Sequence, residues 1–259
     1  MIEIIILIII IVMVIIYIYR LPLFCNVEMF SDVESIKLYN TPKFFNELHG
    51  IHHLDKRYGR PNLKIRHIQN SLVSLLHNFM YHCKINDIKP VLMYGGLIGY
   101  YFNGEMLPWD DDLDMILTEP YISRLKNYNS DDWLIEVNSN SKEYSTYDVN
   151  NIISARVISK ETGAFIDILF HAEIDNMLYC KDKNVYDKDD IYPLQKGKYY
   201  DIDIYLPNKI TECLIKRYGR RVLTPLSSEG WKFNNITKTW SEVIFENSEI
   251  DKSCRFKLE

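Results

Sequence analysis

The sequence predicts an α+β protein, a mixed sheet with flanking helices, preceded by one N-terminal transmembrane helix. Three observations lead to this expectation. An unbroken apolar run fills residues 4–18, a helical period of apolar residues starts at residue 65, and short β-branched segments then alternate with short helices and turns. With 259 residues, 47% of them apolar, the chain has room for one large domain or two small ones.

The apolar run over 4–18 predicts a membrane anchor. A spanning helix needs about 17–25 apolar residues, and the run reaches this length only with its neighbours included. Glu3 at its start and the lack of a small-x-small cleavage site distinguish it from a cleaved signal peptide. We therefore predict an anchor over 1–20, a stalk and entry segment over 21–62 and a folded domain over 63–259.

Apolar periodicity and turn residues predict the elements of this domain. The predicted helices cover 65–86, 97–102, 121–128 and 208–217, and Asn208 caps the last one. The predicted strands cover 90–93, 113–117, 133–137, 152–158 and 164–170, with Thr162-Gly163 as the hairpin turn between the last two. His49, His52 and His53 lie close together, but we expect them in a solvated loop rather than in a metal cluster.

Composition limits the function. The net charge is −5 and no cluster of Lys and Arg is present, so general binding to nucleic acid is not expected. The five cysteines lie far apart without a C-x-x-C pair, which argues against a zinc ribbon or a thioredoxin-like motif. Buried thiols, or one or two disulfides with a free thiol, both stay open.

Gly95-Gly96 lies between a predicted strand and a predicted helix. Glycines there let the backbone approach a phosphate closely, and the start of the helix supplies unpaired N–H donors. We therefore expect Gly95 and Gly96 to bind a substrate phosphate. The pair alone is weak evidence, and its value comes from the acidic segment that follows.

The acidic segment over 110–114 runs directly into a predicted strand. Asp112 and Asp114 are two residues apart, so both carboxylates face the same side of that strand. Two such carboxylates repel each other unless a cation lies between them, and Mg²⁺ or Mn²⁺ fits oxygen ligands of this kind. Asp110 and Asp111 are expected to support the ligands. An EF-hand loop is excluded, because its required Gly and Glu are absent.

Asp167 places a charge inside the apolar strand over 164–170. Burial of an unpaired charge is costly, which favours Asp167 as a third metal ligand or a catalytic base. The alternative is a buried ion pair with Arg156, turned away from the strand that carries Asp112 and Asp114. We expect the metal site, and the ion pair stays open.

The glycine pair and the acidic segment, together with their surroundings, resemble sequences of the LicD family. The resemblance rests on Gly-Gly-Leu-Ile-Gly at 95–99, Asn-Gly at 103–104 and Leu-Pro-Trp-Asp-Asp-Asp-Leu-Asp at 107–114, and it covers about residues 65–225. Ser-Ala-Arg-Val-Ile at 154–158 and Thr-Gly-Ala-Phe-Ile-Asp-Ile at 162–168 are most similar to the fungal group of mannosyl-phosphate transfer. The family also includes fukutin, fukutin-related protein and bacterial phosphocholine transferases.

The resemblance implies a nucleotidyltransferase-like fold for a catalytic domain over 63–259. Such enzymes transfer a phosphorylated group from a CDP- or GDP-linked donor to a glycan hydroxyl. It further implies that Asp112 and Asp114 bind metal and that Asp167 completes the catalytic site. Arg156 is expected either to stabilise the transferred phosphoryl group or to form a structural ion pair. Phe102 stands where bacterial members usually have Arg, which removes a candidate phosphate contact.

The side of the membrane is predicted differently by two signals. Arg20 after the apolar run weakly places the body in the cytoplasm by the positive-inside rule, whereas the resemblance implies the secretory pathway with a lumenal catalytic domain. Asn235-Ile236-Thr237 is an acceptor sequence for glycosylation in such a compartment. The alternative function is a catalytically silent, membrane-anchored accessory protein that regulates a glycosyl-phosphate transferase.

Overall fold

The computed structural model describes residues 53–60, 62–138, 152–180, 184–224 and 227–243. All of them belong to one compact unit, residues 41–259. The predicted anchor over 4–18 and the side chains of His49 and His52 lie outside the described residues. Within the described part, no helix combines the length and the apolar character needed to cross a membrane.

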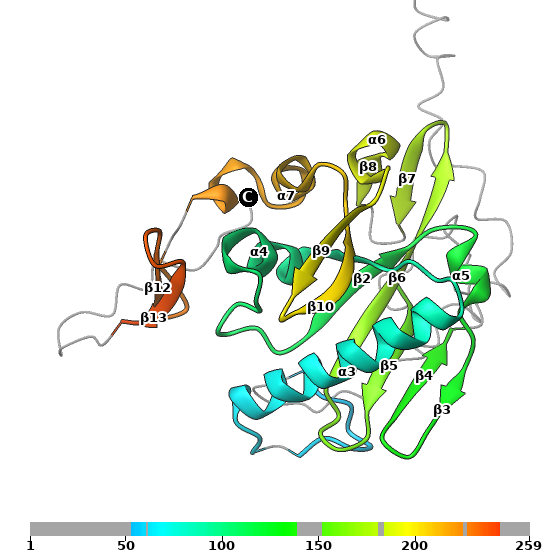
Figure 1. Ribbon diagram of the computed structural model, residues 1–259, viewed down its shortest axis with the longest axis horizontal. Coiled ribbons are helices and arrows are strands. Elements are labelled where there is room, and N and C mark those ends of the chain that lie inside the picture. Colours follow the sequence, from blue (N-terminus) through cyan, green and yellow to red (C-terminus); the bar gives the residue numbers. More distant parts are fainter. Residues whose placement is uncertain (1–52, 61, 139–151, 181–183, 225–226, 244–259) are drawn as a thin grey trace, which may run out of the picture. The chain divides into compact units, whose positions relative to one another are not determined.

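A large mixed sheet forms the centre of the unit (Figure 1). The strand order is β3-β4-β5-β6-β2-β1-β10-β9, with β7 paired to β6 and β8 paired to β7. The pairs β2–β6 and β1–β10 are parallel and the other pairs are antiparallel. The strands are β1 Val91–Met93, β2 Leu113–Leu117, β3 Tyr128–Asn129, β4 Trp133–Val137, β5 Ile153–Ser159, β6 Phe165–Ile174, β7 Met177–Cys180, β8 Val185–Asp187, β9 Gln195–Tyr199 and β10 Ile202–Leu206.

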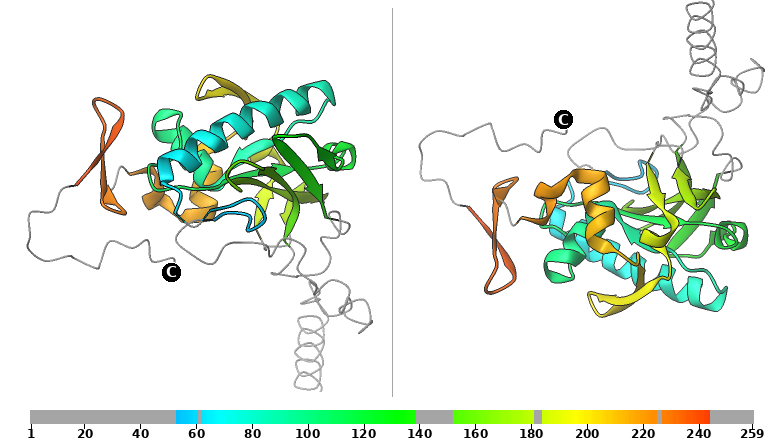
Figure 2. Two further views of the ribbon diagram at one scale, coloured as in Figure 1. Left: turned by 90° about the horizontal axis from the view of Figure 1, so that it is seen from below. Right: turned by 90° about the horizontal axis from the view of Figure 1, so that it is seen from above.

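Helix α3, Ile65–Ile85, lies across one face of this sheet, against β5, β6 and β10 (Figures 1 and 2). Its buried side chains recur every three or four residues, which is the apolar stripe of an amphipathic helix. They are Ile68, Leu72, Leu75, Leu76, Phe79, Met80 and Cys83. The other helices are α4 Tyr94–Asn103, α5 Tyr121–Arg124, α6 Lys188–Ile191, α7 Ile210–Tyr218 and the 3₁₀ helix η2 Arg220–Leu223. Helix α4 contacts β1, β2 and α7.

A small three-stranded antiparallel sheet follows η2. It consists of β11 Ser227–Ser228, β12 Trp231–Asn234 and β13 Thr239–Glu242. The ring of Phe233 lies 4.9 Å from that of Phe102 on α4, and the ring of Trp240 lies 4.9 Å from that of Trp109, between ring centroids. These aromatic contacts attach the small sheet to the segment that leads into β2.

The sequence-based prediction of an α+β fold is confirmed, and most elements lie where the periodicity placed them. The strands over 113–117 and 133–137 are found with the predicted bounds, and α3 differs from its prediction by one residue at the end. The hairpin between β5 and β6 turns at Thr162-Gly163, where Gly163 has a φ of +76°.

Three local predictions were wrong. Helix α4 begins at Tyr94, whose φ of 54° makes the bend, so Gly95 and Gly96 lie in the first helical turn rather than before it. The predicted helix 121–128 ends at Arg124, because the next residue is extended and Tyr128 then pairs with β4. Asn208 does not cap α7: Lys209 holds that position, and Asn208 Nδ2 donates instead to the carbonyl of Asp189.

Candidate active site

The sheet brings the predicted acids together on adjacent strands. Asp114 on β2 is the register partner of Asp167 on β6, and Asp167 is in turn the partner of Arg156 on β5. Residues directly opposite each other across neighbouring strands project from the same face. Asp112 precedes Asp114 by two residues and therefore belongs to this face too. Three carboxylates and one guanidinium thus share one side of the sheet.

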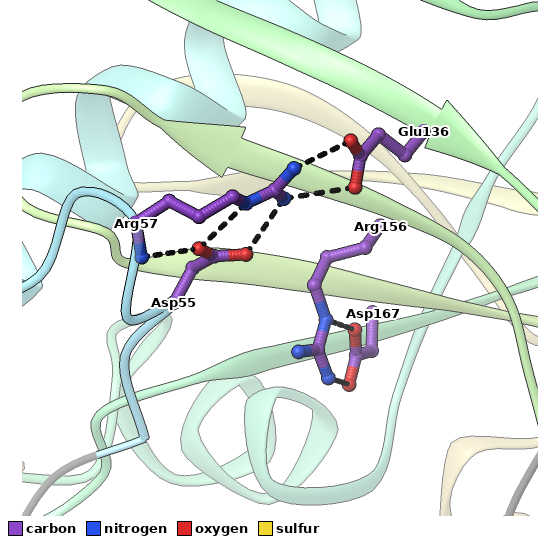
Figure 3. Close-up of polar contacts among 5 residues, drawn as sticks. All are labelled: Asp55, Arg57, Glu136, Arg156 and Asp167. Atoms are coloured by element: carbon purple, nitrogen blue, oxygen red, sulfur yellow. Dashed lines mark hydrogen bonds and ion pairs between the residues drawn. The ribbon is translucent and has the colours of Figure 1, made fainter. Parts of the chain in front are cut away.

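Arg156 and Asp167 form a buried, two-pronged ion pair (Figure 3). Arg156 Nε donates to Asp167 Oδ1 at 2.6 Å, and Nη2 donates to Oδ2 at 2.8 Å. The guanidinium carbon lies 3.6 Å from the centroid of the Phe165 ring, two residues before Asp167 on β6. The sequence left two alternatives for Asp167, an ion pair with Arg156 or a position beside Asp114. The structure shows that Asp167 has both.

The surroundings of the acids oppose negative charge. Burial, with Asp167 and Asp111 adding repulsion, raises the pKa of Asp112 to about 6, although His53 and Arg156 act in the other direction. Burial, Asp112 and Asp167 raise the pKa of Asp114 well above its ordinary value. A divalent cation bound by these carboxylates would offset both the cost of burying their charge and their mutual repulsion. Among the residues that the structure describes, the possible ligand atoms that lie within 4.8 Å of one another belong to His53, Asp111 and Asp112, whereas Asp114 and Asp167 share the sheet face without belonging to this group. Carboxylate oxygens gathered in this way fit Mg²⁺ or Mn²⁺.

Gly95 and Gly96 allow α4 to approach the acidic segment closely. A Cβ on Gly95 would lie 2.5 Å from Oδ2 of Asp110, and a Cβ on Gly96 would lie 2.7 Å from a methyl carbon of Leu92. A larger side chain would displace Asp110 at the first position and the side chains of Leu92 and Leu113, on β1 and β2, at the second. The absence of a side chain at Gly95 and Gly96 thus permits close packing. Phosphate binding by their backbone N–H groups stays a prediction.

Asp110 is a buried acid beside this helix start. Its Oδ2 has no hydrogen-bond partner among the described residues. Burial, with repulsion from Asp112 and Asp111, raises the pKa of Asp110 to about 8. Asp110 thus shares the buried, repulsive environment of Asp112 and Asp114, and its supporting role stays a prediction.

His53 is the site residue that the sequence reasoning missed. It was expected in a solvated loop rather than in a metal cluster. It does lie exposed in an irregular segment, but its ring is beside two acids, which the sequence reasoning did not foresee. Its Nδ1 lies 3.2 Å from Asp111 Oδ1 and 3.9 Å from Asp112 Oδ2. The contact joins residues 58 positions apart, so no local pattern signals it.

Comparison with known proteins agrees with the resemblance. Residues 87–209 match the model of the family described as LicD/FKTN/FKRP, nucleotidyltransferase domain. Two curated proteins of Saccharomyces cerevisiae are similar: Mannosyltransferase regulator 4, 30% identical over 139 residues, and Mannosyltransferase regulator 14, 27% identical over 133 residues. Each alignment covers 45% of this chain but 11% and 14%, respectively, of those proteins, so the chain spans a small part of their length.

The matched range contains all the predicted site residues, whereas His53 and the small sheet β11–β13 lie outside it. The fungal relatives agree with the group to which the motifs pointed. Residues 87–209 of this chain are therefore similar to the nucleotidyltransferase domain of the LicD family.

Proposed function

We propose that this protein is a metal-dependent phosphotransferase. It transfers a phosphorylated group, such as a phospho-sugar, a polyol phosphate or phosphocholine, from a CDP- or GDP-linked donor to the hydroxyl of a glycan. The observation that carries the proposal is that Asp112, Asp114 and Asp167 share one face of the sheet on adjacent strands, with raised pKa values for the first two. Acidic and basic side chains with strongly shifted pKa values are concentrated at functional sites.

Each residue has a distinct part in this proposal. Asp112 and Asp114 hold the cation, which when bound neutralises charge on the donor pyrophosphate. Asp167 shares the cation or accepts the proton of the acceptor hydroxyl, and its pairing with Arg156 fixes its orientation. Arg156 lies close enough to the acids to offset charge on the transferred group as well.

Location forms part of the proposal. The apolar run over 4–18 holds the protein in a membrane of the secretory pathway. The family resemblance favours the lumenal side for the catalytic domain, against the cytoplasmic side that Arg20 indicates by the positive-inside rule. The acceptor residue Asn235 lies exposed in the turn between β12 and β13, so a glycosylating enzyme has access to it there. A glycan on Asn235 in a eukaryotic host would support the lumenal orientation over the cytoplasmic one.

A second candidate is supported by the names of the relatives. Both are called mannosyltransferase regulators, which suggests that a LicD domain can serve regulation. Under this alternative, the protein keeps the fold and its cation site but performs no transfer itself.

The deciding experiment measures nucleotide release from a panel of CDP- and GDP-linked donors, with Mg²⁺ or Mn²⁺ and a glycan acceptor. Asp112→Asn is the test variant. Asp203→Asn is the matched control, because Asp203 is exposed on β10 and pairs with Lys198. Release that is lost in Asp112→Asn but kept in Asp203→Asn supports the transferase. Cation binding without release from any donor supports the regulator.

A further inference from the structure

His53 reaches the acidic segment from outside the family-matched range. Its backbone N donates to Asp111 Oδ2 at 3.1 Å, while its ring lies beside Asp111 and Asp112. One possible ligand atom from each of these three residues lies within 4.8 Å of the other two. The ring is 63% exposed, so a small rotation can change its contacts without disturbing the core.

The segment that carries His53 is attached to the turn between β5 and β6. The backbone N of Asp55 donates to the carbonyl of Gly163 at 2.7 Å. A Cβ on Gly163 would lie 2.5 Å from the N of Gly59 and 2.6 Å from the carbonyl oxygen of Asp55. Only glycine allows this close approach at a φ of +76°. The hairpin turn is thus shaped to receive residues 55–59.

Arg57 fastens the same segment to β4 (Figure 3). Its Nε and Nη2 donate to the two carboxylate oxygens of Asp55 at 2.9 and 2.8 Å. Its Nη1 and Nη2 donate to the two oxygens of Glu136 at 2.7 and 2.9 Å. These hydrogen bonds to two carboxylates raise the pKa of Arg57. Glu136 is the register partner of Arg156, so Arg57 joins the same row of charges that contains Asp167.

We propose that His53 is a ligand of the divalent cation held at Asp112, and that Arg57 is the positioning residue that keeps the 53–59 segment over the site. This inference rests on the proposed cation site and adds a nitrogen ligand to it. Mg²⁺ prefers oxygen ligands, whereas an imidazole favours a transition metal. The site is therefore selective for Mn²⁺ over Mg²⁺. To bind the cation, Nδ1 must be unprotonated, so any proton it carries is released to solvent.

The test loads the full chain with Mn²⁺ and records its pulsed EPR spectrum, in which a directly coordinated imidazole nitrogen produces a characteristic modulation of the echo. The variants are His53→Gln and, as a matched control, His77→Gln, since His77 is an exposed histidine on α3. We expect the nitrogen modulation in the wild type and in His77→Gln but not in His53→Gln. We also expect His53→Gln to weaken Mn²⁺ binding by about tenfold or more, with a smaller change for Mg²⁺.

Arg57→Met tests the positioning role, with Arg124→Met as control because Arg124 forms an exposed ion pair with Asp87 elsewhere on the surface. We expect Arg57→Met to lose the nitrogen modulation while Mn²⁺ still binds to the carboxylates. If Arg57→Met does not fold, Glu136→Gln weakens the same attachment and leaves the pair with Asp55 in place.

Three outcomes overturn parts of the inference separately. Bound Mn²⁺ without nitrogen modulation in the wild type overturns the role of His53 and leaves the proposed cation site standing. An unchanged modulation in both Arg57→Met and Glu136→Gln overturns the positioning role alone. A wild-type protein that binds neither Mn²⁺ nor Mg²⁺ overturns this inference and the metal-dependent function together.

Discussion

Replacement of Arg156 by methionine tests whether the acids form one electrostatic unit. Arg156 is 2% exposed, and its guanidinium is bound to Asp167 by two hydrogen bonds of 2.6 and 2.8 Å. Methionine has a similar length and no charge, so Arg156→Met removes the countercharge with little change in volume. Asp167, only 6% exposed, is then left beside Asp114 without its arginine.

The expected magnitude follows from this burial. Loss of one partner of a buried ion pair typically destabilises a protein by about 3–5 kcal/mol. For a compact unit of this size, that corresponds to a fall in Tm of roughly 6–20 °C. A divalent cation supplies the missing positive charge, and at a hundredfold excess over its Kd it contributes about 2.7 kcal/mol. The variant should therefore gain more stability from Mg²⁺ than the wild type does.

The assay is thermal unfolding with and without Mg²⁺ for the wild type, Arg156→Met, Asp167→Asn and the double variant. We expect Arg156→Met to melt lower and to recover a large part of the loss in Mg²⁺. The double variant should lose less stability than the two single variants lose in sum, because it removes both charges of the pair. Asp167→Asn should be destabilised and should respond less to Mg²⁺. An Arg156→Met protein that melts like the wild type would refute the reasoning.

Four further predictions follow from the same structure. In the metal-free state, Asp112→Asn or Asp114→Asn should preserve or raise the melting temperature, because each relieves repulsion among buried carboxylates; a clear fall would indicate a structural role. The pKa values of Asp112 and Asp110 are raised to about 6 and about 8, so the folded state binds more protons than the unfolded one between about pH 4 and 8. The contribution of these two acids to metal-free stability should accordingly fall as the pH rises from about 4 to 8, by at most about 1.4 kcal/mol per pH unit for each group, which the difference between the wild type and Asp110→Asn or Asp112→Asn in unfolding at a series of pH values measures. Gly163→Ala should be more destabilising than Gly230→Ala, because both have positive φ but only Gly163 has backbone atoms within 2.7 Å of the added Cβ; equal losses in chemical denaturation would contradict this. Finally, the run over 4–18 should make the full chain resistant to carbonate extraction from membranes, and removal of residues 1–24 should abolish that resistance.

Local patterns carried much of the prediction. The helical period of α3 and the β-branched run of β2 depend on which side of one element is apolar, and that information lies within the element itself. The acidic segment before β2 was visible for the same reason. Its specific motif also led to the LicD family before any fold was known.

Two of the wrong predictions concern residues whose contact with another element overrides their local preference. Asn208 is a good capping residue, yet its amide binds the carbonyl of Asp189, nineteen positions away. The predicted helix after Pro120 stops early, because pairing of Tyr128 with β4 extends the sheet. The partner of Asn208 lies outside the sequence window of a periodicity argument, and the pairing of Tyr128 with Ile135 belongs to a hairpin that a helical period does not represent.

The sequence by itself determined which residues we propose for the chemistry: Asp112 and Asp114 share one face because alternation along a strand is a local property. It did not decide between a metal site and an ion pair for Asp167, because both depend on which strands lie beside β6. Only the tertiary structure shows that β2 and β5 flank it, so that Asp167 lies between Asp114 and Arg156. The same holds for His53, whose contact with Asp111 depends on the attachment of residues 55–59 to the turn at Gly163. Strand order and long-range attachment are set by the packing of the whole chain, and this packing decided how the charges are paired.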